Sequence, residues 1–245
     1  MTKQSGLGDQ LFAGGFDIGG DINSIGSLST PRETLPATGI TVFAQERMFG
    51  KRDGQAEFTS YWNVDTDRVF DALSPLPRTN VHVMYCRGET IGNEAFCIVG
   101  KQVDYNPSRG DDGSLLSTTS VPSAIYGADW ARQLTAGKDT HASGASTTTL
   151  DTLASVSFGF QAYLQVFSIG SGTAEVTIQD SANGTDWLTL SGGEFTDVTA
   201  RTTERIQSSS ATAAVRRYLR VTTSGTFTDL VFAVAINKNA AARAL

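Results

Sequence analysis

The segment GKQVDYNPSRGDDGSLLSTTSVPS, residues 100–123, decides the fold class of this chain of 245 residues. One strand leads into it, and a second strand, rich in Ser, Thr and Val, follows. Between them, residues 106–113 contain Pro107 and two glycines. Proline presets φ, and glycine reaches backbone conformations that other residues adopt only at a cost. The pattern predicts a β-hairpin with its connection at residues 106–113.

The composition also favours strands separated by turns. The chain contains 25 Gly, and its Val, Ile, Phe and Tyr residues recur with strand-like spacing. Its net charge is −6, and residues 1–149 hold 12 basic against 17 acidic side chains. This balance argues against a protein that holds nucleic acid by neutralising its phosphates. We therefore expect an all-β protein with an acidic N-terminal half.

The two cysteines, Cys86 and Cys97, each lie within a predicted strand. Two cysteines do not make a secreted disulfide framework, so we expect buried free thiols, with a cross-strand disulfide as the alternative. The N-terminus lacks the apolar core of a signal peptide, and no apolar run is long enough to span a membrane. We expect folding in the cytoplasm, without membrane insertion.

Composition divides the chain into four parts. Residues 1–39, rich in Gly, Ser, Pro and Thr, are interpreted as an arm that docks on something, or as a loosely packed terminus. Residues 40–134 form a first β domain. Residues 135–150 (TAGKDTHASGASTTTL) are predicted to be a linker. Residues 151–245 have the length and turn spacing of a small β-sandwich.

One short helix is expected within the first domain. Asp65 is a natural N-cap, and Val69, Phe70 and Leu73 follow at helical spacing before a proline. The strongest strands are predicted at residues 55–62, 81–87 and 95–103, the last two joined as a hairpin.

Two groups of oxygen-bearing side chains are candidate cation sites, because hard cations need several oxygen ligands. The first is Asp65, Asp67 and Asp71, and the second is Asp180, Asn183 and Asp186. Capping explains the first group, and a hairpin turn explains the second. We predict no metal and no cofactor.

The remaining polar candidates also have structural explanations. His82 and His141 have no nucleophile and acid beside them that would make a catalytic site, so no catalytic residue is predicted. The tripeptide Arg109-Gly110-Asp111 consists of ordinary turn formers. Basic residues near Tyr218 suit either an anionic or sugar partner or a solvated sheet face; they are Arg205, Arg216, Arg217 and Arg220.

The order of these elements resembles that of the major tail (tail tube) proteins of long, non-contractile-tailed bacteriophages of actinobacterial hosts. Three stretches carry the resemblance over most of residues 1–137: FTSYWNVDTDRVFDALSPLPRTNVHVMYCRG, FCIVGKQVDYNPSRGDDGSLLSTTSV and YGADWARQLTAG. The second half resembles the β-sandwich appendage that such proteins can carry, in QAYLQVFSIGSG, VTIQDSANGTDW and RYLRVTTSGTFTDLVFAVAINKN.

The resemblance implies a tail-tube-type β-sandwich or barrel and a non-enzymatic virion protein. Its subunits close into hexameric rings that stack, with other tail proteins as partners, while DNA passes through without specific binding. An acidic wall would repel phosphates. The candidate lumen-facing acids are Asp53, Glu57, Asp104, Asp111 and Asp112. The candidate contacts between rings or subunits are Leu11, Phe12, Phe16, Ile18, Phe49 and Arg52.

Two other functions fit the same sequence. One is a carbohydrate-binding adhesin or head decoration protein that recognises the host cell surface through its C-terminal domain. The other is a glycan hydrolase that uses paired carboxylates, although no such pair stands out. If the second domain hangs on a flexible linker, it must lie outside the tube, because it would block the lumen.

Overall fold

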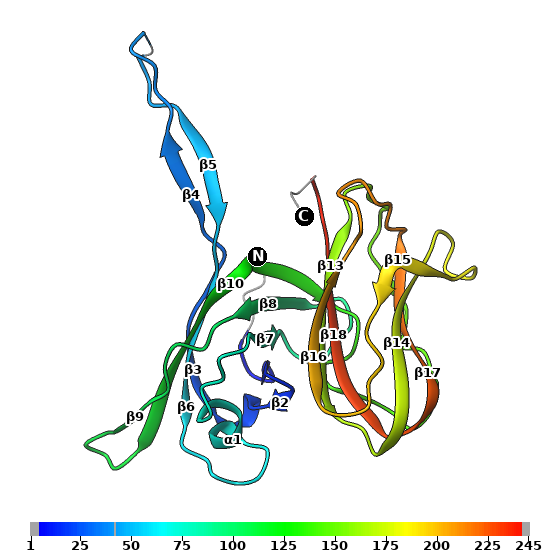
Figure 1. The fold of residues 1–245 in the computed structure, drawn as a ribbon, viewed down its shortest axis with the longest axis horizontal. Helices are drawn as coiled ribbons and strands as arrows, with labels where there is room; N and C mark the ends of the chain where they lie inside the picture. Colours follow the sequence, from blue (N-terminus) through cyan, green and yellow to red (C-terminus); the bar gives the residue numbers. More distant parts are fainter. Residues whose placement is uncertain (1–4, 42, 242–245) are drawn as a thin grey trace.

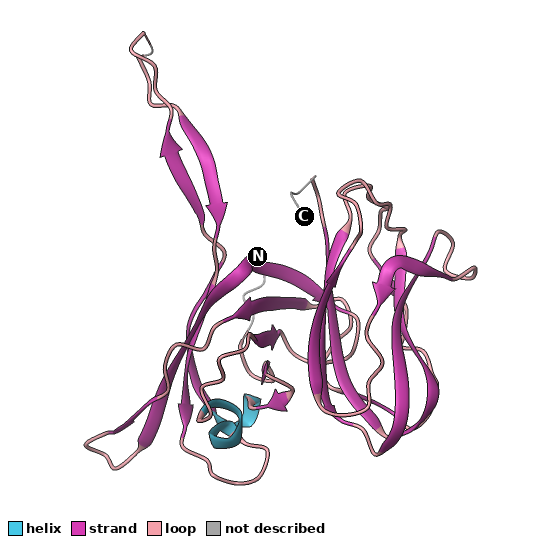
Figure 2. Ribbon diagram, in the orientation of Figure 1, coloured by secondary structure: helices cyan, strands magenta, loops and turns pink. Residues whose placement is uncertain are grey.

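The computed structural model describes residues 5–41 and 43–241, and it confirms an all-β protein (Figures 1 and 2). Its helical elements are the short helix α1, Val69–Leu73, and one 3₁₀ turn, Gly19–Asp21. None of the helices among the described residues has the length and hydropathy needed to cross a bilayer.

The strands of the N-terminal half are β1 (Gln10–Ala13), β2 (Phe16–Asp17), β3 (Ile22–Ser29), β4 (Arg32–Pro36), β5 (Arg47–Arg52), β6 (Gln55–Tyr61), β7 (Val81–Cys86), β8 (Glu94–Gly100), β9 (Asn106–Arg109) and β10 (Leu115–Gln133). Those of the C-terminal half are β11 (Asp139–His141), β12 (Leu150–Asp151), β13 (Phe160–Ser168), β14 (Ser171–Ser181), β15 (Leu188–Glu194), β16 (Thr202–Gln207), β17 (Tyr218–Thr228) and β18 (Leu230–Lys238).

One continuous sheet joins the two halves, with the strand order β16-β13-β18-β10-β8-β7-β1-β2. The joint is the antiparallel pairing of β10 with β18, in which Arg132 faces Ile236 and Gln133 faces Ala235. A bulge between Ser123 and Ala128 bends the 19-residue strand β10. Its first part therefore pairs with β6 and β9, and its second part with β8.

Three apolar cores hold these layers together. The first lies inside the N-terminal half and includes Phe58 and Phe96. Another lies between the continuous sheet and the four-stranded sheet β12-β17-β14-β15. The third is shared by the two halves: Tyr163 and Phe167 of β13 pack with side chains from β1, β7, β8 and β10. Within it the rings of Phe12 and Phe167 meet edge to face at 4.8 Å.

The prediction of a free linker at residues 135–150 is wrong. Strand β11 pairs with β18, and β12 pairs with β17. The hydroxyl of Thr135 accepts the Val234 N–H at 3.0 Å, and the Thr147 N–H donates to Val221 O at 2.8 Å. A Ser/Thr-rich stretch looks unstructured by composition, but here its hydroxyls and backbone bind the C-terminal sheets. The expectation that the C-terminal domain lies outside the tube assumed a flexible linker, so it no longer has that support.

The predicted helix exists, but its start is different. It begins at Val69, its N-cap is Arg68, and no side chain caps it. Asp65 instead accepts the Arg68 N–H through its backbone carbonyl at 3.2 Å, and the Asp71 carboxylate accepts the Asp67 N–H at 2.9 Å. Asp67 has a φ of 63°, so a helix cannot begin at Asp65 and run through it.

The opening hairpin is confirmed, with a tighter turn than predicted. Residues 106–109 are already strand β9, paired with β10, and the Gly110 N–H donates to Ser114 O at 2.8 Å. Pro107 is tolerated because β9 is an edge strand. Cys86 and Cys97 are free and buried, as expected, and burial raises the pKa of the Cys86 thiol to about 12.

His82 gives the joint between the halves a pH dependence. It lies on β7, where its carbonyl accepts the Gln165 side-chain N–H of β13 at 2.9 Å. Burial, and then the nearby Arg205 guanidinium, lower the pKa of its imidazole to about 4. In the unfolded chain the pKa is about 6.5. As the pH falls between these values, the unfolded state binds the proton first, and stability is lost.

We expect the free energy of unfolding to fall by up to about 3 kcal/mol from His82 alone between pH 6.5 and pH 4. Urea unfolding of the wild type and of His82→Gln, measured across this range, checks it. The pKa of His141 is also lowered, mainly by burial, so the difference between the two profiles is the quantity to compare. Parallel profiles would contradict the assignment to His82.

Candidate assembly surfaces

A β-hairpin projects from the body of the protein, as Figure 1 shows for β4 and β5. We call residues 32–52 the arm and residues 37–46 its tip. The two strands form a sheet of their own. At the tip Ile40 and Phe43 are fully exposed, and along the stem Met48 and Phe49 are 59% and 74% exposed. An isolated two-stranded hairpin is marginally stable, and apolar groups gathered in one place mark a contact surface.

The base of the arm is fixed to the body by a buried ion pair. Arg52, at the end of β5, donates to the Asp129 carboxylate at 2.9 Å and to the Ala128 carbonyl at 2.6 Å. Asp129 is 1% exposed and also accepts the Tyr163 hydroxyl at 2.6 Å. Because Tyr163 belongs to β13, this carboxylate links the arm, β10 and the C-terminal half. The role of Asp129 could not be predicted from the sequence, because its partners Arg52 and Tyr163 are far from it along the chain.

The predicted contact residues divide into two groups. Leu11, Phe12 and Ile18 are 0–2% exposed within the chain's own cores, so they have no surface to offer a neighbouring subunit. That part of the prediction is corrected: the start of the expected arm forms β1 and joins the continuous sheet. Phe16 lies under the Arg201 guanidinium, 4.1 Å from it. Phe49 stays on the exposed arm.

A second surface is the sheet β3-β6-β10-β9, which has open strands at both edges. Edge strand β3, INSIGSLS, is eight residues long and contains no charged side chain. Such an edge presents unpaired backbone N–H and C=O groups and is a template for pairing with another chain, unless charges or proline block it. The opposite edge is β9.

The outer face of this sheet is rich in hydroxyl groups. Along β6 Ala56, Phe58 and Ser60 point inward, so Gln55, Glu57, Thr59 and Tyr61 point outward. Neighbouring strands place Ser27 beside Glu57 and Thr118 beside Thr59. The Gln55 amide donates to the Ser120 hydroxyl at 3.1 Å.

The five predicted lumen-facing acids do not gather in one cluster. Glu57 lies on the outer face of β6. Asp104 accepts the Ser120 N–H at 2.7 Å and so supports the backbone of β10. Asp53 is at the root of the arm, whereas Asp111 and Asp112 are at the turn of the β9–β10 hairpin, beyond the other end of β6. Hydrogen bonds from Ser114 lower the pKa of Asp112.

The candidate cation sites are occupied by hydrogen bonds of the chain itself. Asp67 pairs with Arg201 at 2.7 Å, and Asp186 accepts the Asn183 amide at 2.6 Å. Asp180 accepts the Arg216 backbone N–H at 2.9 Å. Within residues 5–41 and 43–241, no three His, Cys, Asp or Glu side chains come together to hold a metal.

The basic residues near Tyr218 are spread over separate contacts. Arg217 pairs with Asp151 at 2.6 Å, Arg220 lies over the Trp187 ring at 4.3 Å, and Arg205 lies over Tyr126 at 4.0 Å. Each cation is engaged with a different group. The Arg109-Gly110-Asp111 tripeptide is exposed at the end of β9 and its turn. Recognition of a glycan by this half stays a prediction.

Comparisons with known proteins give faint structural likenesses. No family model matches the chain, and no curated protein matches it. A sheath/tube terminator of an extracellular contractile injection system, PVC, aligns with 53% of this chain and 98% of its own, at 8% identity and a TM-score of 0.43. A chain of a gene transfer agent virion aligns with 52% of this chain and 98% of its own, at 11% identity and a TM-score of 0.41. The SPP1 Dit protein, described as a hub adsorption apparatus, aligns with 94% of this chain and 99% of its own, at 10% identity and a TM-score of 0.36. These scores are too low to place the chain in any of these groups.

Proposed function

We propose that this chain is a structural subunit of a bacteriophage tail, which closes into rings through the open edges of the sheet β3-β6-β10-β9. The single observation that carries the proposal is β3, an eight-residue edge strand without a charge. Solvated edge strands are usually short, charged, bulged or interrupted by proline, because they otherwise pair with other chains. Strand β3 shifts register twice against β6, but it has neither a charge nor a proline. A sheet edge left open in this way suits a protein whose assembled form covers it.

The topology provides a partner for that edge. Strands β3, β6, β10 and β9 are each antiparallel to the next, so β3 and β9 run in opposite directions. A neighbour rotated about a ring axis brings its β3 antiparallel to β9 of the first subunit. The two edges differ, so this contact is heterologous, and repetition about a closing axis generates a ring. We propose six subunits per ring, with rings stacked along the tail.

The outer face of the same sheet would line the lumen. Its paired positions carry Ser, Thr and Gln side chains, with Glu57 among them. Hydroxyl and carboxylate groups release no counterions from DNA, so such a wall does not hold the phosphate backbone. This surface suits a conduit for DNA and needs no catalytic group.

Charging the edge tests the proposal. We expect wild-type protein at high concentration to form rings or tubes in negative-stain images. Ser24→Lys, which places a charge on β3, should raise the concentration needed for assembly about tenfold or more, because an edge lysine opposes strand pairing. Thr148→Lys, an exposed change in the C-terminal half, is the control. Wild-type protein that stays monomeric by light scattering, or equal assembly of both variants, would contradict the proposal.

A further inference from the structure

A groove crosses the face of the continuous sheet where the two halves meet. It consists of two adjoining hollows, of about 340 Å³ and about 440 Å³, and both are lined by Glu94 and Trp130. One wall includes Leu28 of β3, and the other includes Val156 of the segment before β13. We call this the seam groove. It exists because the covering layers of the two halves do not meet above the β10–β18 joint.

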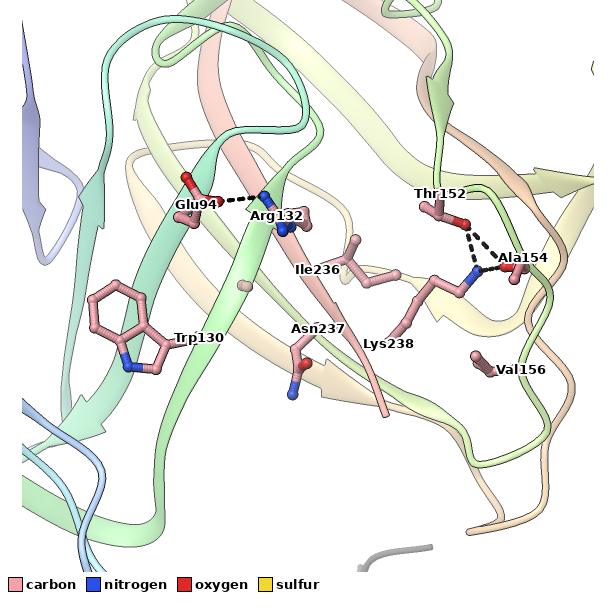
Figure 3. A pocket seen from close by; sticks show the side chains of 10 residues that line it. Glu94, Trp130, Arg132, Thr152, Ala154, Val156, Ile236, Asn237 and Lys238 are labelled. Carbon is pink, nitrogen blue, oxygen red and sulfur yellow. Dashed lines mark hydrogen bonds and ion pairs between the residues drawn. The ribbon is translucent and has the colours of Figure 1, made fainter. Parts of the chain in front are cut away.

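The seam groove has an apolar centre with charges around it. Trp130 is 48% exposed, and its ring is held edge to face on Phe96 at 5.4 Å. Figure 3 shows the indole apart from the Glu94–Arg132 ion pair, whose atoms are 2.6 Å apart. A half-exposed tryptophan on a rigid support has the character of a binding anchor.

Lys238 shapes the far wall of the groove. Its ammonium group donates to the Thr152 hydroxyl at 2.6 Å and to the Ala154 carbonyl at 2.7 Å (Figure 3). It also donates to the Arg216 carbonyl at 3.0 Å. An ammonium has three N–H donors, so these contacts use all of them. The wall is therefore held in place before anything binds. Burial lowers the pKa of Lys238 to about 8.

The charges in the groove favour an occupant with a carboxylate. Three cations and one carboxylate line it: Arg87, Arg132 and Lys238 against Glu94. Asp9 pairs with Arg87 from outside the groove lining, at 3.3 Å. Each of these cations already has a partner: Arg132 pairs with Glu94, Arg87 pairs with Asp9, and Lys238 donates all three of its N–H groups to oxygen atoms of the wall. An incoming carboxylate would therefore share Arg132 or Arg87 with its present acid, above an apolar floor.

The tip of the arm has the matching chemistry. Residues 37–46 read ATGITVFAQE, with apolar side chains and a single charge, Glu46. Ile40 and Phe43 are fully exposed at the end of this segment. The arm is also long enough to reach another molecule. Strand β4 alone, from Arg32 to Pro36, spans about 13 Å, and the tip lies beyond it.

We propose that the arm tip of one subunit docks in the seam groove of a neighbouring copy, with Phe43 and Ile40 against Trp130 and Glu46 toward the rim cations. The inference rests on the proposed self-assembly and names the receiving surface for the arm. The groove adjoins the edge that closes the ring, because Leu28 belongs to β3. Each molecule thus carries both the arm tip and the seam groove. A contact between two such different surfaces is heterologous.

Cross-linking the full-length chain locates the tip. In the variant Ala44→Cys/Ala154→Cys, which keeps Phe43, one thiol lies at the tip and the other lines the groove; mild oxidation should join chains into ladders on denaturing gels. The matched variant Ala44→Cys/Leu188→Cys places the second thiol on β15, where the side chain is 55% exposed. We expect at least about tenfold more covalent multimer from the first pair. The native thiols are buried in both variants.

Trp130→Ala gives an independent readout. Removing a central aromatic side chain commonly weakens binding between two proteins about thirtyfold or more, so we expect Trp130→Ala to weaken the contact between subunits by this factor. Trp130→Phe should retain part of the affinity between subunits. Urea unfolding of the unassembled variants shows whether the fold is intact. Rings that form without the groove cross-link, or with equal cross-linking of both pairs, would overturn the docking site and leave the ring proposal standing. Protein that forms neither rings nor cross-links would overturn both.

Discussion

Replacing Asp129 by alanine is expected to lower the free energy of unfolding by about 3–5 kcal/mol, because it removes one partner of a buried ion pair. The carboxylate is 1% exposed and accepts hydrogen bonds from Arg52 at 2.9 Å and from Tyr163 at 2.6 Å. Without it, the Tyr163 hydroxyl inside the shared core loses its acceptor, and the Arg52 guanidinium at the base of the arm keeps only the Ala128 carbonyl. Desolvated groups left without a partner cost more than the pair contributed.

Urea unfolding of Asp129→Ala and Asp151→Ala measures this effect. Asp151 also pairs with an arginine, at 2.6 Å, but its side chain is 37% exposed. Solvent screens an exposed pair, so we expect a much smaller loss of stability from this variant, which is the matched control. Hydrogen exchange should also rise at the base of the arm in Asp129→Ala, where Arg52 loses one of its two acceptors on β10. Equal losses in the two variants would show that burial does not set the importance of Asp129.

The local elements of this fold could be predicted from the sequence because their signals are local. The β7–β8 hairpin follows from alternating side chains around a Gly-containing turn. A hairpin near residue 110 was also expected, but its first strand, β9, lies at residues 106–109, which were expected to be part of the turn. Helix α1 follows from the spacing of Val69, Phe70 and Leu73. Its exact start did not follow, because the positive φ of Asp67 depends on tertiary contacts that include the Arg201 ion pair.

The joint between the halves could not be predicted in the same way. It pairs residues about a hundred positions apart, such as Arg132 and Ile236. The sequence of neither strand indicates which strand it pairs with. The linker predicted at residues 135–150 was wrong for a related reason. The Thr hydroxyls of this segment accept hydrogen bonds from the backbone of β17 and β18, and composition does not reveal such contacts.

The candidate site was also found only in part. Glu57 and Phe49 were expected at a lumen wall and at a subunit contact, and they lie on the outer face of β6 and on the exposed arm. The hairpin that forms the arm was not expected. Leu11 and Phe12 were also expected to contact neighbouring subunits, and their side chains are as apolar as that of Phe49. Only the sheet that surrounds them decides which of these residues face solvent.

Splitting the chain should abolish cooperative folding of both parts. Cutting after Ser143, in an exposed turn, gives fragments 1–143 and 144–245. The first loses Tyr163, Phe167, Ala233 and Ala235 from the shared core, and the second loses β10 and β11 from the edge of β18. Each fragment then exposes apolar surface worth about 25 cal/mol per Å² and leaves strand edges unpaired.

Denaturant titration of each fragment, together with binding of an apolar dye, tests this expectation. We expect broad transitions and strong dye binding for either fragment alone, with one sharp transition restored when equal amounts are mixed. A domain that folds alone carries its own core and joins its neighbour through a linker that few contacts cross. A sharp transition of fragment 144–245 by itself, near the midpoint of the intact chain, would mean that the C-terminal half is such a domain after all. The β10–β18 pairing would then be a docking contact between separately folded units.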